Sequence, residues 1–196
     1  MLLTDSDLSG YQVIQEDQLT SALAQSGSIT GSIDDVKVTP PECADTFKEQ
    51  SQGMGRLSEI SQSGAVTVLT KGQGAMVTEL IAPKSAVGVD LMKAQIVSDK
   101  CAEMTMDIQG VTANITMKPI AVPALGDKAA GTAITEEMQI SGKTIKIAIV
   151  SIVVEQNGKY LSIGSMGQEA DAASVESEIK QIAQQAYDKA EPVLSK

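Results

Sequence analysis

The chain has 196 residues, of which 42% are hydrophobic and 20% charged, and its net charge is −10. This length and composition predict one globular domain spanning residues 1–196. An acidic chain lacks the basic surface that releases counterions from nucleic acid, so nucleic acid is excluded as a partner. Aromatic residues make up only 2% of the chain, which predicts a core of aliphatic side chains and Met.

The N-terminal part predicts little regular structure. Thr4 followed by Asp7 is typical of a helix start, and Gly10 ends that short helix. Residues 11–14 and 28–38 predict strand fragments. Six acidic and no basic side chains precede residue 37. This imbalance indicates either a solvated segment or an acidic face for a cation or a basic partner.

The next part of the chain predicts a helix, a hairpin and a second helix. A Thr-Pro-Pro-Glu sequence suits a first helical turn, so a helix is expected over residues 39–53. Residues 66–69 and 75–82 have the composition of strands and are separated by a Gly-bearing turn, which predicts a β-hairpin. Another helix is expected over residues 84–98, because a proline precedes it and apolar residues recur at helical spacing.

From residue 102 onward the sequence predicts mainly strands. Apolar and polar residues alternate on both sides of Gly110, which predicts an antiparallel hairpin with one buried face. Asn157-Gly158 supplies the positive φ angles of a type I′ turn. A final amphipathic helix is expected to begin at Asp171 and end at Pro192. The strands expected here are 104–108, 111–117, 129–140, 143–155 and 160–165.

These elements indicate an α+β fold. The order of elements favours a curved antiparallel β-sheet of about six or seven strands, flanked by three helices. The alternating strand and helix units of dinucleotide-binding folds are absent from the pattern. No apolar run approaches the roughly 18 residues of a membrane span, and the residues before Thr4 do not predict a signal peptide. The chain is therefore expected to be either cytoplasmic or the mature form of an exported protein with an added Met.

Cys43 and Cys101 are the only cysteines. They can form one intramolecular disulfide. Such a bridge would stabilise the fold by roughly 4 kcal/mol, because it restricts the conformations of the unfolded chain. The alternatives are two buried thiols, or metal or redox chemistry. No Cys-x-x-Cys motif supports the last of these.

The sequence lacks the residues of common catalytic sites. It contains no His, which excludes Ser-His-Asp and Cys-His catalysis and His-ligated metals. It also has no phosphate-binding loop motif. Glu136 and Glu137 are adjacent on a predicted strand and point to opposite faces, so they cannot act as a pair. Asp34 and Asp35 lie in a turn-like segment. We therefore expect no enzyme activity, no catalytic residue and no cofactor.

One calcium-like spacing occurs near the N-terminus. Residues 5–10 and Glu16 match several positions of an EF-hand loop. Against this interpretation, Gln12 stands where an aliphatic residue is usual, and Asp5 and Asp7 also suit a first helical turn. No metal ligand is assigned.

Eight methionines accompany Met1, and several occupy inward positions of predicted strands. They can fill the core in place of aromatic side chains. The alternative is an adaptable apolar cavity for a lipid or another hydrophobic ligand.

Short motifs give the chain a family resemblance. The opening Leu-Leu-Thr-Asp-Ser-Asp-Leu at 2–8, Pro-Pro-x-Cys at 40–43 and the second cysteine at 101 resemble actinobacterial surface lipoproteins. More specifically, they are similar to the PknH-like extracellular sensor domain family. The resemblance implies an antiparallel sheet with flanking helices, a ligand-binding cleft and a lipid anchor on an upstream cysteine. Kinase-linked members of that family carry two disulfides, whereas this chain can form only one. A PsbP-like envelope lipoprotein is a related alternative.

The function expected from the sequence is therefore binding. We expect a non-enzymatic, extracellular cell-envelope domain that binds an unidentified ligand or protein partner, as a sensor or accessory lipoprotein. The membrane would be contacted only through a lipid anchor. The alternative is a carrier of lipid or another hydrophobic ligand in a Met-rich cavity.

Overall fold

The computed structural model describes residues 1–14, 36–48, 63–72, 74–108, 110–140, 142–168 and 172–196. All the strands in these ranges belong to one antiparallel sheet with the order β1-β3-β4-β9-β8-β7-β6-β5-β2. The strands are β1 (Gln12–Val13), β2 (Lys37–Thr39), β3 (Ala65–Lys71), β4 (Ala75–Pro83), β5 (Glu103–Ile108), β6 (Val111–Pro119), β7 (Lys128–Ile140), β8 (Lys143–Gln156) and β9 (Lys159–Gln168).

Three hairpins of this sheet confirm the sequence predictions. Strands β3–β4, β5–β6 and β8–β9 pair in the expected antiparallel way, and the consecutive strands β7 and β8 also pair antiparallel. The β8–β9 turn has Asn157 at φ 47° and Gly158 at φ 72°, which are the positive angles that a type I′ turn requires. The sheet has nine strands in the described ranges instead of six or seven, because β1 and β2 add short edge strands.

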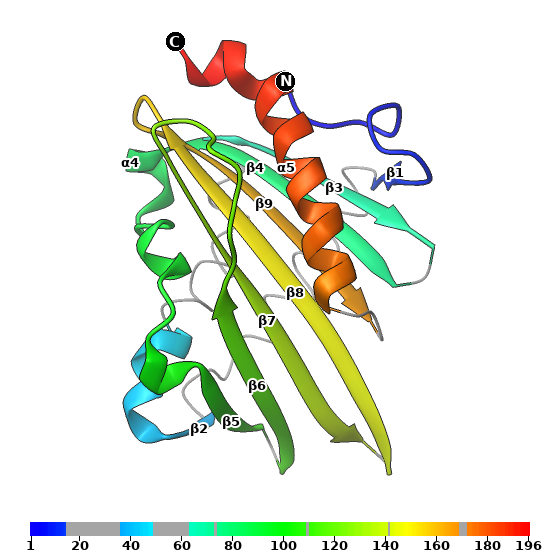
Figure 1. Cartoon of the computed structure of the whole chain (residues 1–196), viewed down its shortest axis with the longest axis vertical. Helices are drawn as coiled ribbons and strands as arrows, with labels where there is room; N and C mark the ends of the chain where they lie inside the picture. Colours follow the sequence, from blue (N-terminus) through cyan, green and yellow to red (C-terminus); the bar gives the residue numbers. More distant parts are fainter. Residues whose placement is uncertain (15–35, 49–62, 73, 109, 141, 169–171) are drawn as a thin grey trace.

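One long helix covers one face of the sheet. Helix α5 (Ala172–Leu194) lies across β8 and β9 (Figure 1). Its buried side chains recur every three or four residues, as an amphipathic helix requires. They are Val175, Ile179, Ile182, Ala183, Ala186, Ala190 and Leu194.

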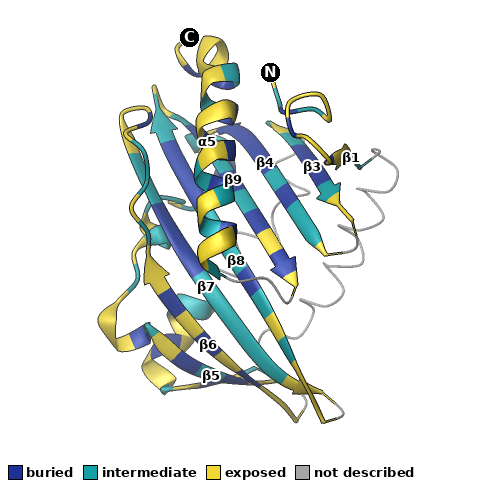
Figure 2. Ribbon diagram, turned by 45° about the vertical axis from the view of Figure 1, so that its right-hand side comes forward, coloured by how far each residue is buried: buried dark blue, intermediate teal, exposed yellow. Residues whose placement is uncertain are grey.

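The main core lies between α5 and the sheet. Alternate residues of the central strands point toward the helix, so β8 contributes Ala148, Val150, Ile152 and Val154. Figure 2 shows this alternation of buried and less buried residues along the strands. The core beneath α5 contains no methionine among its buried members.

Short helical segments lie against the opposite face. They are α4 (Lys84–Val87), η2 (Pro41–Cys43), η3 (Lys93–Gln95) and η4 (Asp99–Cys101). Val87 of α4 packs with Leu80 and Tyr160 in a small core of its own. A third cluster surrounds Cys43 and Cys101 at the β2–β5 edge.

The expected helix over residues 84–98 is wrong. It ends after one turn because Gly88 adopts a left-handed conformation at φ 71°. The Asp90 carboxylate then accepts hydrogen bonds from the backbone N–H groups of Met92 and Lys93. It also accepts a hydrogen bond from the Tyr160 hydroxyl, with the two oxygens 2.9 Å apart. These polar contacts favour a turn over a continued helix.

Three other expectations change at element ends. Residues 4–10 form turns instead of a helix, and the Thr4–Asp7 contact closes one of them. The helix expected over residues 39–53 is a 3-10 turn followed by helical residues 44–48, and its remainder lies outside the described residues. Pro192 lies inside α5, which continues to Leu194.

Asp171, the expected helix cap, falls outside the described ranges, as do residues 28–35 of the second strand fragment. Among the described residues, no helix is long and apolar enough to cross a membrane.

Candidate functional site

The face of the sheet opposite α5 carries all six methionines of the described strands. Cross-strand pairs share a face, so Met76 and Met166 lie side by side, and Met166 pairs onward to Ile149. The same alternation places the remaining strand methionines on this side. The Met-rich face, as we name it, has the members Met76, Met104, Met106, Met117, Met138 and Met166.

The methionines differ in exposure across this face. Met104, Met106 and Met117 are buried in the cluster at the β2–β5 edge. Met76 and Met138 are half-buried, and Met166 is 37% exposed. The Met-rich face is therefore closed core at one edge and partly accessible at its β4–β9 end. The sequence interpretation as core filler fits the first part only.

Part of this face is occupied by the chain itself. Gln95 of η3 holds that segment on the sheet, since its carbonyl accepts from Thr132 Oγ1 at 2.9 Å and its side chain accepts from Ser151 Oγ at 2.8 Å. Lys84 of α4 forms an ion pair with Glu155 at 3.1 Å. These contacts lie in the half of β8 and β9 next to the turn that joins them. Helices α4 and η3 make none of them with the start of β8 or the end of β9.

A shallow groove lies at those opposite ends. Its volume is about 370 Å³, which falls within the range of small-molecule sites. Met76, Ile147 and Met166 supply its apolar lining. The other residues around it are Thr70, Gly72, Gly74, Ala75 and Gln168.

Glu136 is a single carboxylate within the apolar rows beside this groove. It pairs across the sheet with Ile115 on one side and Ile147 on the other. The side chain is half-buried, and burial raises its pKa. No hydrogen bond or ion pair involves Glu136 in the described part of the chain. Ile147 lines the groove, so Glu136 stands one strand beyond its border.

Glu137 confirms the predicted geometry of the adjacent pair. It pairs with Lys146 and forms an ion pair with that lysine at 2.6 Å, with its side chain 45% exposed. Glu136 and Glu137 therefore lie on opposite faces, as expected from strand alternation. They do not form a two-carboxylate site.

A second unusual carboxylate lies on the α5 side. Glu79 of β4 is fully buried, and its Oε2 accepts the backbone N–H of Leu3 at 2.6 Å. Its Oε1 has no hydrogen-bond partner in the described part of the chain. Burial raises the pKa of Glu79 to about 7.

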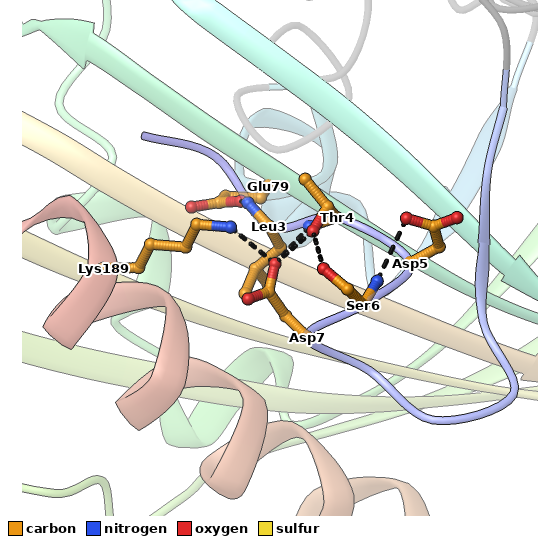
Figure 3. A network of polar contacts seen from close by, with 7 residues as sticks. All are labelled: Leu3, Thr4, Asp5, Ser6, Asp7, Glu79 and Lys189. Atoms are coloured by element: carbon orange, nitrogen blue, oxygen red, sulfur yellow. Dashed lines mark hydrogen bonds and ion pairs between the residues drawn. The ribbon is translucent and has the colours of Figure 1, made fainter.

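The N-terminal residues form a polar network next to Glu79 (Figure 3). Lys189 of α5 contacts the Asp7 carboxylate at 2.5 Å, and Thr4 donates to the same carboxylate at 2.6 Å from both its backbone N–H and its hydroxyl. These hydrogen bonds lower the pKa of Asp7 to about 2. The network fixes the N-terminal residues against both β4 and the C-terminal part of α5.

This arrangement bears on the calcium-like spacing. The Asp7 carboxylate is engaged by Lys189 and Thr4, and Asp5 accepts from the backbone N–H of Ser6. Glu16 lies outside the described residues, as do Asp34 and Asp35. No group of three or more acidic or Cys side chains with metal-binding geometry occurs in the described ranges.

The two cysteines form the expected disulfide. Cys43 and Cys101 are bonded, with their Cα atoms 5.6 Å apart. The bridge joins η2 to η4 and packs against Val38 and Met104 in the cluster at the sheet edge. Its surroundings are apolar and buried, so its role in this fold is structural.

Sequence reasoning did not single out Glu79 or Glu136 as buried carboxylates. A usable signal was present in the strand alternation. Glu79 lies between Val77 and Ile81 on one face of its strand, and Glu136 lies between Ile134 and Met138. A charged residue at an inward position of a strand is costly and therefore informative.

Comparison with known proteins gives a distant match. No family model matches this chain, and no curated protein does so either. Among solved structures, the chain is similar to the crystal structure of the extracellular domain of PknH from Mycobacterium tuberculosis. The TM-score is 0.42 at 13% identity, covering 92% of this chain and 98% of the other. The similarity is a distant resemblance between folds.

Proposed function

We propose that this chain is a non-enzymatic, extracellular binding domain of a cell envelope, acting as a sensor or accessory lipoprotein. The Met-rich face is proposed as its contact surface. The observation that carries this proposal is the segregation of methionine. All six strand methionines lie on one face, and the core beneath α5 contains none among its buried members.

Methionine suits a surface that must fit a partner. Its side chain is flexible and polarizable, so it adapts to irregular apolar shapes. A purely space-filling role would not require the accessible positions of Met76, Met138 and Met166. Two of these accessible methionines, Met76 and Met166, line the groove of about 370 Å³. This supports binding at the β4–β9 end of the face.

The disulfide supports an extracytoplasmic location. Disulfides persist in oxidising compartments and are rare in the cytosol. The actinobacterial origin, the lipid anchor and the sensor role rest on the sequence motifs described above. The absence of His from the whole sequence supports binding over turnover.

A carrier of lipid or another hydrophobic ligand is the second candidate. The same Met-lined groove favours it. A carrier must shield its cargo from water on most sides, however, and the groove is shallow. We therefore place the surface-binding function first.

The test is binding of a neutral apolar dye, Nile red, to the folded protein. We expect saturable binding that weakens at least tenfold in the variant Met76→Ser/Met166→Ser, because two apolar groove walls become polar. The matched control is Ile96→Ser, which alters a side chain that is 69% exposed and lies away from the groove. Equal dye binding by the wild type and the double variant would refute the proposed surface.

Native mass spectrometry of the exported protein then separates the two functions, since only a carrier should retain a co-purified lipid.

A further inference from the structure

Glu136 gives the Met-rich face a charge that the described chain does not neutralise. Its cross-strand neighbours are Ile115 and Ile147, and its neighbours two positions along the same face of β7 are Ile134 and Met138. A carboxylate surrounded by apolar side chains loses solvation and normally gains a partner in compensation. No partner is present in the described part of this chain.

From this placement we infer that the Met-rich face binds a cationic amphiphile, with an amine at Glu136 and an alkyl chain in the adjacent groove. The inference rests on the proposed function and specifies its ligand class. A neutral lipid would leave the Glu136 carboxylate unpaired, and an anionic one would be repelled by it. An amine would form a charge-assisted hydrogen bond there.

The dimensions of the sheet fit such a ligand. Strand neighbours are about 4.8 Å apart, and the groove walls run from Thr70 of β3 to Ile147 of β8 over β4 and β9. That path crosses three strand spacings, or about 14 Å. Glu136 on β7 adds one more spacing beyond Ile147. The full path from Thr70 to Glu136 is therefore about 19 Å. An extended chain of about ten carbons is shorter than this, so with its amine at Glu136 it lies over Ile147 and the Met166 end of the groove without reaching Thr70.

The face also suits a flexible apolar tail. Met76 and Met166 form a cross-strand pair in the groove, and thioether side chains adapt to an alkyl chain. Among the described residues no aromatic side chain lines the groove, so binding there relies on apolar contact and not on stacking.

The experiment compares three ligands of the same length. Decylamine, decanol and decanoate are titrated against Nile red on the intact protein at pH 8, below the concentrations at which they aggregate. We expect decylamine to displace the dye at a concentration about tenfold lower than decanol needs, because the amine makes a charge-assisted contact. Decanoate should be the weakest of the three.

The matched variants are Glu136→Gln and Glu137→Gln. They remove the same charge from adjacent positions on opposite faces of one strand. We expect Glu136→Gln to reduce the amine preference to within about twofold, and Glu137→Gln to keep it near tenfold. Equal loss in both variants would mean that general attraction to an acidic protein causes the preference, and would overturn the inference.

The wild-type comparison alone also decides, whatever the variants do to folding. Equal displacement by decylamine and decanol would overturn the inference, even if Nile red binding still depends on Met76 and Met166. In that outcome the proposed surface stands and only its ligand class is wrong. Both proposals would be overturned together if the Met76→Ser/Met166→Ser variant bound Nile red as well as the wild type does. They would also be overturned if the wild type bound no dye because the chain itself covers this face.

Discussion

The buried carboxylate of Glu79 predicts an unusual dependence of stability on pH. Its pKa is raised to about 7 from the usual 4.5, because burial disfavours the charged form. The difference corresponds to about 3 kcal/mol, at about 1.4 kcal/mol for each pH unit. The backbone N–H of Leu3 and the nearby Lys189 oppose the rise, while Asp7 adds to it. Loss of water is therefore the dominant cause.

The sign follows from proton linkage. Below pH 4.5 the carboxyl group of Glu79 is protonated in both the folded and unfolded states, and above pH 7 it is ionised in both. Between these values the folded state binds more protons, so the free energy of unfolding falls as pH rises. Glu79 should therefore lower stability by about 3 kcal/mol between pH 4.5 and pH 8.

The perturbation is Glu79→Gln, which keeps the shape and removes the ionisation. The amide leaves an extra buried N–H group unsatisfied, which costs about 1 to 3 kcal/mol at every pH. The informative quantity is therefore the change with pH of the difference between the variant and the wild type. Urea denaturation at intervals from pH 4.5 to pH 8 should show the variant gaining about 3 kcal/mol relative to the wild type.

The control is Glu137→Gln, which removes an exposed carboxylate from an ion pair with Lys146. Its unfolding free energy should run nearly parallel to that of the wild type across the same pH range. A constant difference between Glu79→Gln and the wild type would refute the assignment of Glu79 as a buried, neutralised carboxyl. Hydrogen exchange provides a second measurement, because the backbone N–H of Leu3 should exchange faster once its partner is weakened.

Three further predictions concern the frame of the fold. Replacing both Cys43 and Cys101 with Ser should lower the free energy of unfolding by about 4 kcal/mol, measured by urea denaturation, because a loop of 58 residues is released; a loss below about 1 kcal/mol would show that the bridge contributes little. Gly131→Ala should cost about 2 kcal/mol, since a Cβ there would lie 2.8 Å from side-chain atoms of Ile120 and 2.9 Å from the Ser151 carbonyl; an unchanged melting temperature would contradict this packing. Gly158→Ala should lower the free energy of unfolding by about 1 kcal/mol through the strain of its φ of 72° alone, because a Cβ there meets no atom within 4 Å. A much larger loss of stability in calorimetry would contradict the open space around this turn.

Local pattern was sufficient for most strands and for the final helix. Period-two alternation around Gly110 and the Asn157-Gly158 turn depend only on neighbouring residues, and the structure confirms both hairpins. Helical spacing likewise predicted the buried face of α5. The opposite directions of Glu136 and Glu137 also followed from alternation alone.

Local pattern failed where distant residues compete for the backbone or its side chains. Residues 84–98 have helical spacing, yet Asp90 is held by Tyr160, which lies 70 positions along the chain. The N-terminal Thr4–Asp7 pair looked like a helix cap, and it instead closes a turn fixed by Lys189. The short edge strands β1 and β2 do fall at the strand fragments expected over residues 11–14 and 28–38, and each is held by pairing with a neighbouring strand.

Residue type and short-range period were enough to predict the α+β class, the hairpins around Gly110 and Asn157-Gly158, and the amphipathic helix, because these features depend on residues close together in the chain. The order of strands in space was needed to show that the strand methionines share one face, that Glu136 has no partner among the described residues beside a groove on that face, and that Glu79 is buried beneath the N-terminal residues. Those features arise from the order of strands in the sheet and from contacts between residues far apart in the chain. Loop closure over such distances leaves no periodic trace in a single sequence.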